Sequence, residues 1–249
     1  MDLTVRGHRF NVHRAGVAGP PVVMLHGAVV GNLMTWLCGV APALSGSHRL
    51  LLLDARSHGL SQRCAQGHDV AEQARDVWAI AEAVFPGEAV ALVGHSFGAV
   101  VALAAGRAEP QRTLAVAAVE PPLPPTDPGA LERFLRQDPE QLRASLPAGG
   151  LLGAGRRVRR FAEHVRFLLE DTDLPLALER GLADPDAGAL PVGIPLLGMF
   201  GDASPCLVAA GSLPPHAKIV VLPGGHFLPV EQAGAVAAEL VRFLGEPRG

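Results

Sequence analysis

The stretch ALVGHSFGAV, residues 91–100, constrains the fold of this chain more than any other. It joins an apolar run to an Ala- and Val-rich continuation through the pattern Gly-x-Ser-x-Gly, with Ser96 at its centre. When this pattern follows a buried strand and precedes a helix, the turn is so sharp that the neighbours of the serine must be small. Gly94 and Gly98 meet that condition. We therefore predict that the turn presents Ser96 as a nucleophile, in preference to the alternative that Ser96 is polar filler.

The apolar runs on either side of this turn predict an α/β fold with a mostly parallel, doubly wound sheet. Near-continuous apolar runs are typical of parallel strands buried on both faces, and they occur at residues 21–25, 50–54, 89–93, 113–120, 195–200 and 217–222. Segments with helical spacing lie between them, at 70–85, 97–107 and 229–244. This alternation predicts right-handed crossovers and a ligand site beyond the carboxyl ends of the strands. Before the first run, residues 3–7 and 9–16 alternate apolar with polar residues, which predicts two antiparallel strands.

Residues 121–190 interrupt the alternation of strands and helices. They contain no strand candidate, only a proline-rich start and apparent helices such as 131–136 and 161–169. A structureless loop of this length is improbable in a compact domain. We therefore predict that 121–190 is a helical lid or cap over one end of the sheet, inserted into a core formed by 1–120 and 191–249.

Charge and hydropathy exclude several classes of partner. The net charge is −3 and the pI about 6.4, which gives no electrostatic case for nucleic-acid binding. The basic run at 155–160 is expected to be a solvated helix face. No apolar run has the length of a membrane helix, and charges occupy the start of the chain where a signal peptide would be apolar. A bacterial, cytoplasmic protein with no membrane partner is the expectation.

The cysteines suggest neither a disulfide framework nor a metal site. There are three, Cys38, Cys64 and Cys206, and they are far apart and lack C-x-x-C spacing. We expect them to be small packing residues, and we expect no metal and no organic cofactor.

His226 is the predicted general base for Ser96. A serine hydroxyl is a poor nucleophile at neutral pH, so a base must take its proton. Among ten histidines, His226 lies in a glycine-rich loop between the last predicted strand and the last predicted helix. His95 is expected to lie beneath the turn, and His58 to bond a neighbouring loop.

Attack on a carbonyl also requires donors for the oxyanion, and backbone N–H groups do this best because they are fixed before the reaction begins. We predict that one donor is the amide of Phe97, directly after the nucleophile, and that the other is the amide of Ala28, after the His-Gly pair of LHGAV.

Four segments carry a family resemblance: LHGAVVGNLMTW, LLLDARSHGLS, VGHSFGAVVALAAG and LPGGHFLPVE. In this order and spacing they resemble the α/β-hydrolase superfamily across nearly the whole chain, in its lid-containing branch with a serine nucleophile. The resemblance implies an eight-stranded sheet, a lid after the sixth strand, and a triad in the chain order Ser, acid, His. It implies Ser96 and His226 for two of these roles, and a structural role for Asp54.

The triad acid departs from the family pattern. Relatives usually carry it in a Gly-Asp-x-Asp pattern, but this chain reads GDASP, so Ser204 occupies the place of the acid. Two carboxylates could substitute. Glu120 ends the sixth predicted strand, where some relatives carry their acid, and Asp202 lies two residues from the usual position. Glu120 is preferred and Asp202 is the second choice, because a carboxylate at a covered strand end requires a partner; a triad without a strong acid is left open.

The combined prediction is a serine hydrolase that cleaves an ester, thioester or related acyl bond of a small, apolar substrate through an acyl-enzyme. Met34, Trp36 and Phe227 are candidates for the substrate pocket. Two alternatives remain open: a lyase, cyclase or acyl transferase using the same triad, and an inactive ligand-binding protein. Substrate identity and oligomeric state are not predicted.

Overall fold

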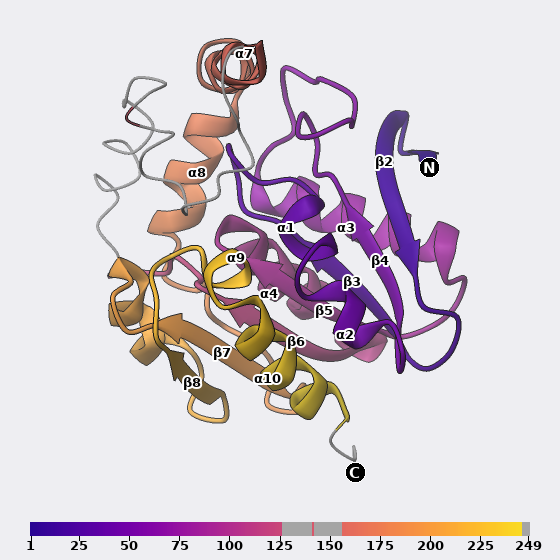
Figure 1. Cartoon of the computed structure of the whole chain (residues 1–249), viewed down its shortest axis with the longest axis vertical. Helices are drawn as coiled ribbons and strands as arrows, with labels where there is room; N and C mark the ends of the chain where they lie inside the picture. The colour runs from indigo at the N-terminus through magenta and orange to yellow at the C-terminus, as the bar shows by residue number, and fades with distance from the viewer. Residues whose placement is uncertain (126–140, 142–155, 246–249) are drawn as a thin grey trace.

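The computed structural model of the chain describes residues 1–125, 141 and 156–245. Within these residues a single sheet has the strand order β1-β2-β4-β3-β5-β6-β7-β8 (Figure 1). Strands β1 and β2 pair antiparallel, β2 pairs antiparallel with β4, and every later neighbouring pair is parallel. The strands are β1 Asp2–Val5, β2 His8–Ala15, β3 Pro21–Leu25, β4 Arg49–Leu53, β5 Val90–His95, β6 Thr113–Val119, β7 Leu196–Gly201 and β8 Lys218–Leu222.

The predicted mostly parallel, eight-stranded, doubly wound sheet is therefore confirmed. Each apolar run of the sequence forms a strand whose limits differ from the predicted ones by at most two residues. The two N-terminal strands are antiparallel, as their alternating pattern predicts.

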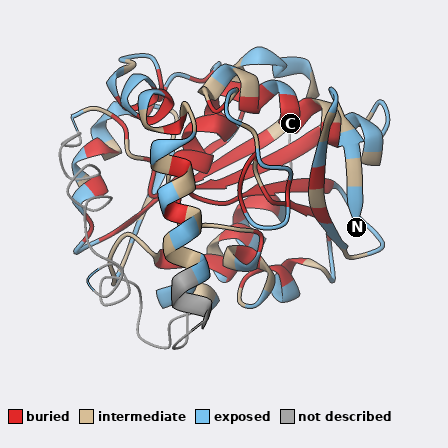
Figure 2. Ribbon diagram, turned by 90° about the horizontal axis from the view of Figure 1, so that it is seen from above, coloured by how far each residue is buried: buried red, intermediate tan, exposed pale blue. Residues whose placement is uncertain are grey.

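Helices cover both faces of the sheet, and alternate strand residues point to the two sides. Val22 and Met24 of β3 belong to one apolar cluster, whereas Val23 and Leu25 belong to the other. One face is covered by α1 Met34–Leu37, α2 Ala41–Leu44 and α10 Ala233–Gly245, the other by α3 Val70–Val84 and α4 Phe97–Ala108. In Figure 2 the buried strands lie between these layers. Removing a large apolar side chain from such a layer typically costs about 2–5 kcal/mol.

Local contacts explain where these helices begin and end and how α3 is joined to α4. The Asp69 side chain accepts the amide of Glu72 at 2.9 Å and so caps α3. The indole of Trp78 donates to the carbonyl oxygen of Ala105 at 2.9 Å, which joins α3 to α4. The helix predicted over 229–244 is two helices, α9 Leu228–Glu231 and α10, because Gln232 leaves the helical conformation. Short 3-10 turns, η1 Pro110–Arg112 and η2 Pro205–Ser212, precede β6 and follow β7.

The described part of the predicted insertion is helical and lies over the loops that follow β4 and β5. It contains α7 Arg156–Glu170 and α8 Leu174–Ala183 (Figure 1); the helix predicted at 131–136 lies outside the described residues. Between these helices, Asp173 accepts the amide of Gly67 at 2.9 Å. A Cβ on Gly181 of α8 would lie 3.0 Å from the ring of Phe97, the residue after Ser96. Helix α8 therefore lies beside Phe97, next to the predicted nucleophile.

None of the helices in the described residues combines the length and apolar character needed to cross a membrane.

Candidate active site

Ser96 occupies a strained turn between β5 and α4. Its backbone has φ 54° and ψ −128°, a conformation that residues with a side chain rarely adopt. A Cβ on Gly94 would overlap the carbonyl oxygen of Gly98, and a Cβ on Gly98 would overlap that of His26. Because the backbone segments approach so closely, only glycine fits at both positions. The Ser96 amide donates to Val119 at 2.9 Å, and the side chain is half-buried at the end of the sheet.

His226 reaches Ser96 from the loop between β8 and α9. Its Nε2 lies 2.9 Å from Ser96 Oγ, so the predicted nucleophile and base are within hydrogen-bonding distance. His95 supports this loop, since its Nε2–H donates to the carbonyl oxygen of His226 at 2.7 Å. Burial, together with the charge of His226, lowers the pKa of His95 to about 3. His95 is therefore a neutral donor beneath the turn, as the sequence predicts.

Glu120 lies behind His226, directly after β6. Its amide extends the β6–β7 pairing by donating to Met199 at 2.8 Å, and its φ of 56° turns the carboxylate toward the site. Oε2 lies 3.1 Å from His226 Nδ1. The side chain is fully buried, and the amide of Gly201 donates to Oε1 while the Ser204 hydroxyl donates to Oε2. Ser204 occupies the usual place of the acid after β7. It therefore hydrogen-bonds Glu120, the carboxylate at the end of β6.

Asp202, the second choice for the acid, lies at an exposed turn. Its Oδ1 accepts the amide of Gly224 at 3.0 Å, and within the described residues it makes no hydrogen bond to His226. This contact joins the turn after β7 to the loop after β8. Of the two carboxylates, the fold brings Glu120 to His226.

Cys206 is a neighbour of the base that sequence reasoning missed. Its Sγ lies 3.4 Å from His226 Nδ1, and the thiol is buried in the core as well. Burial lowers the pKa of His226, but the hydrogen bonds and charges of Cys206 and Glu120 outweigh this effect and raise it to about 9. No signal in the sequence pointed to this thiol, because Cys206 resembles an ordinary core residue. Cys206, Glu120 and His226 also form the one group of three potential metal ligands found in the described residues.

Both predicted oxyanion donors belong to segments next to Ser96. A Cβ on Gly27 would be 3.0 Å from the Cβ of Ser96, so the loop carrying Ala28 abuts the nucleophile. Phe97 is the first residue of α4, where a helix leaves its N–H groups without intrahelical acceptors. Within the described residues, neither the Ala28 nor the Phe97 amide donates to a protein acceptor. Both are thus available to a developing negative charge.

Buried polar side chains hold the loop that carries Ala28. His58 Nε2 accepts the amide of Val29 at 2.8 Å, and Asp54 Oδ1 accepts that of Leu33 at 2.7 Å. Val29 has φ 66°, which is unfavourable for a β-branched residue and is maintained by these contacts. Burial lowers the pKa of His58, so its imidazole stays neutral and accepts. The loop-binding role of His58 and the structural role of Asp54 agree with the sequence predictions.

The three predicted pocket residues have different surroundings. Phe227 is half-buried, with its ring centroid 5.6 Å from that of His226, and Met34 is 37% exposed. Trp36 is fully buried in the cluster that includes α2 and α10, and its indole donates to Leu25 at 3.0 Å. Its predicted pocket role is therefore wrong, because its position on α1 turns the side chain into the core.

A cavity that the sequence did not predict lies between the Ala28 loop and α7. The loop contributes residues 29–32, and α7 contributes Phe161 and His164. The ring of His164 makes an edge contact with His58 at 5.9 Å between centroids. Helix α7 therefore lines this space beside the predicted oxyanion loop.

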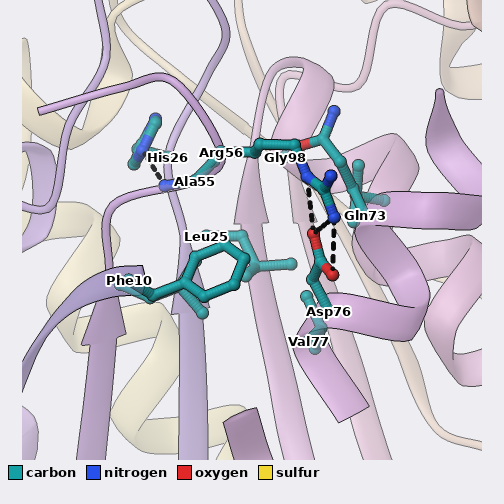
Figure 3. Close-up of a pocket in the computed structure, with 11 residues that line it drawn as sticks. Phe10, Leu25, His26, Ala55, Arg56, Gln73, Asp76, Val77 and Gly98 are labelled. Atoms are coloured by element: carbon teal, nitrogen blue, oxygen red, sulfur yellow. Dashed lines mark hydrogen bonds and ion pairs between the residues drawn. The ribbon is translucent and has the colours of Figure 1, made fainter. Parts of the chain in front are cut away.

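A second cavity lies beneath the turn and is structural (Figure 3). Arg56 and Asp76 form a buried ion pair at 2.7 Å along its wall, as the dashed lines in Figure 3 show. Ser96, Glu120 and His226 do not line it. The ion pair connects the loop after β4 to α3.

Comparisons with known proteins agree with this fold. A sequence profile of the family described as alpha/beta hydrolase fold matches residues 20–203. A relative from Caenorhabditis elegans named "Probable protein phosphatase methylesterase 1" is 35% identical over 107 residues, which cover 41% of this chain and 29% of that protein. A 2-hydroxymuconate semialdehyde hydrolase from Pseudomonas sp. (strain CF600) is 36% identical over 118 residues, covering 45% of this chain and 39% of that protein. Both matches span less than half of the relative's own length.

A solved structure extends the likeness over the whole chain. A variant of a meta-cleavage product hydrolase superimposes with a TM-score of 0.79 at 19% identity, covering 99% of this chain and 98% of the other. At this identity the likeness is one of fold.

Proposed function

The chain belongs to the alpha/beta hydrolase family, and on this premise we propose that it is a serine hydrolase that cleaves an ester, thioester or related acyl bond through an acyl-enzyme. One observation carries the proposal. A continuous hydrogen-bonded series runs from Ser96 Oγ to His226 Nε2 at 2.9 Å and from His226 Nδ1 to Glu120 Oε2 at 3.1 Å. Nucleophile, base and orienting carboxylate in this arrangement are the components of acyl transfer.

In this mechanism Ser96 Oγ attacks the substrate carbonyl while its proton passes to His226 Nε2. The carbonyl oxygen becomes an oxyanion that accepts the amides of Ala28 and Phe97; losing one such donor typically costs about 3–4 kcal/mol of transition-state stabilisation. His226 then protonates the leaving alcohol or thiol, which departs and leaves Ser96 acylated. A water molecule, deprotonated by His226, releases the acid and restores Ser96.

Glu120 has two functions in this proposal. It accepts the Nδ1 proton of His226, which leaves the Nε2 lone pair directed at Ser96, and its charge stabilises the imidazolium that forms. The hydrogen bonds from Gly201 and Ser204 hold the carboxylate in place. A buried carboxylate without these partners would be costly.

We also propose that α7 and α8 act as a lid that selects the substrate. Phe161 of α7 and the valines of the oxyanion loop line a small cavity together with Asn32 and His164, and the apolar part of this lining suits an acyl group. Two relatives are named as a methylesterase and a semialdehyde hydrolase, and both names describe hydrolytic reactions. Short apolar acyl esters are therefore the first substrates to test.

A fluorophosphonate probe tests the proposal directly, because it reacts with a serine that is activated by a base. Ser96 should be labelled in the full chain, and Ser96→Ala should abolish both labelling and the hydrolysis of acyl esters of graded chain length. Failure to label folded protein would contradict the proposal and favour a ligand-binding protein on the same scaffold. Labelling with acyl transfer only to an added second nucleophile would favour a transferase.

A further inference from the structure

Three different potential metal ligands meet behind the triad histidine. Cys206 Sγ lies 3.4 Å from His226 Nδ1, Glu120 Oε2 lies 3.1 Å from the same nitrogen, and the three ligand atoms all lie within 4.8 Å of one another. Zinc binds thiolate at about 2.3 Å and imidazole or carboxylate at about 2.0–2.2 Å, so tetrahedral ligands lie about 3.4–3.6 Å apart. The two short separations match these values to within a few tenths of an ångström.

Burial and charge at this cluster favour a dication. Cys206 is 3% exposed and Glu120 is fully buried, so the two acidic groups are shielded from water. A thiolate and a carboxylate together neutralise Zn²⁺, and a buried group of zero net charge avoids most of the desolvation penalty of a lone ion. The third ligand residue, His226, has a side chain that is 27% exposed.

We propose that Cys206, His226 Nδ1 and Glu120 form a site for Zn²⁺ whose occupation switches off the base. Three protein ligands leave the fourth tetrahedral position for water. Binding itself does not depend on the proposed function, but its effect on turnover does.

The inhibition follows from the two nitrogens of the imidazole ring. Zinc takes the Nδ1 lone pair, so His226 keeps a single ring proton on Nε2; the second ring proton of the imidazolium form and the proton of the Cys206 thiol are released to solvent. Nε2–H then faces Ser96 Oγ as a donor and has no lone pair left to accept the serine proton. Glu120 is diverted from the ring to the metal. No electron is transferred, and removing zinc restores the original tautomer.

A second cysteine–histidine pair provides a matched control. Cys64 Sγ lies 3.5 Å from His8 Nδ1, nearly the same separation as at the proposed site. Here, however, the Arg56 guanidinium lies 3.1 Å from His8 Nε2, and its positive charge opposes a metal cation. No carboxylate joins this pair as a third ligand among the described residues. Cys64 should therefore not bind zinc.

The experiment uses the full chain, stripped of metal, and measures zinc binding by competition with a chromophoric chelator. We expect one equivalent to bind to the unaltered chain and to Cys64→Ser. Losing even an outer-shell partner of a metal site typically costs about 10–100-fold in affinity, so Cys206→Ser should cost at least about 100-fold. Equal affinity in Cys206→Ser and the unaltered chain would overturn the proposal.

Cobalt substitution identifies the thiol without altering the core. The chain has three cysteines, so Cys38→Ser combined with Cys64→Ser leaves Cys206 as the only thiol. This variant should still give a thiolate-to-cobalt charge-transfer band when Co²⁺ binds. A bound cobalt spectrum without that band would overturn the proposal even if Cys206→Ser does not fold.

The inhibitory effect is measured by fluorophosphonate labelling of Ser96 with and without zinc, each variant relative to its own zinc-free rate. Zinc should suppress labelling of the unaltered chain and of Cys64→Ser at least about tenfold, and a chelator should restore it. If zinc binds through Cys206 but labelling continues unchanged, the switch is refuted. If no ester is hydrolysed but zinc binds as described, the metal site stands and the hydrolase proposal fails.

Discussion

Replacing Glu120 with glutamine tests which carboxylate is the acid of the proposed triad. The substitution keeps the size of the side chain but replaces one carboxylate oxygen with an NH₂ group. Oε1 accepts from Gly201, and Oε2 faces both His226 and Ser204. Because the Gly201 amide can only donate, the glutamine carbonyl must take that position, and its NH₂ group then faces His226.

The size of the effect follows from this reversal. An NH₂ group directed at Nδ1 requires a lone pair there, so the His226 proton moves to Nε2 and the ring can no longer accept the proton of Ser96. The equivalent tautomer error in serine proteases lowers kcat by about 10⁴-fold, which corresponds to about 5 kcal/mol of transition-state stabilisation. We expect Glu120→Gln to lower kcat/KM by a similar factor.

The assay compares kcat/KM for a short acyl ester in Glu120→Gln and Asp202→Asn. Asp202 is exposed, and its hydrogen-bond partner among the described residues is the amide of Gly224 at 3.0 Å, so its replacement should change turnover by less than about tenfold. Thermal unfolding of both variants separates loss of chemistry from loss of fold. A larger defect in Asp202→Asn, or near-normal turnover in well-folded Glu120→Gln, would refute the assignment of the acid.

Three further predictions concern pH, backbone contact and the insertion. Burial lowers the pKa of His226, but Cys206 and Glu120 outweigh this effect and raise it to about 9, while His95 beneath it stays neutral. The base is therefore protonated at lower pH, and kcat/KM in chelator-treated protein should rise with pH up to about 9. A plateau of kcat/KM from pH 7 would contradict this prediction. Gly98→Ala should lower the melting temperature sharply, because the new Cβ overlaps the backbone of the loop after β3. The control variant Gly46→Ala should change the melting temperature little, because open space surrounds Gly46. Asp173→Asn should destabilise the protein by about 1–2 kcal/mol in thermal unfolding, because Asp173 accepts from His68 and Gly67; an unchanged melting temperature would show that this contact does not anchor the insertion.

Local sequence patterns predicted most of the fold. Each parallel strand is a short apolar run closed by a turn residue, and such a run is recognisable without knowledge of its neighbours. The turn at Ser96 is equally local, because Gly94 and Gly98 are required by contacts within a few residues and by the adjacent loop. The histidine of the site follows from chain order, since it is in the loop that leads from the last strand to the last helices.

The composition of the site behind His226 depended on long-range contacts. Glu120 and Ser204 are 84 residues apart, and no pattern in either segment shows that a serine will bond the distant carboxylate. Cys206 is an ordinary core residue by sequence, and it meets His226 only because β7 and β8 are neighbours in the sheet. The prediction for Trp36 was wrong because the burial of its side chain also depends on distant elements. A helix of four residues is too short for its sequence to show which side faces the core.

The sequence by itself therefore determined which segments become strands and helices, and which serine and histidine end at the same edge of the sheet, because periodicity and turn chemistry act over a few residues. Only the tertiary structure decided that Glu120, held by Gly201 and Ser204, lies beside His226 and that a thiol shares the Nδ1 of this histidine. These contacts form between strand ends that are far apart in the chain. Their energies depend on which other residues the fold places beside them.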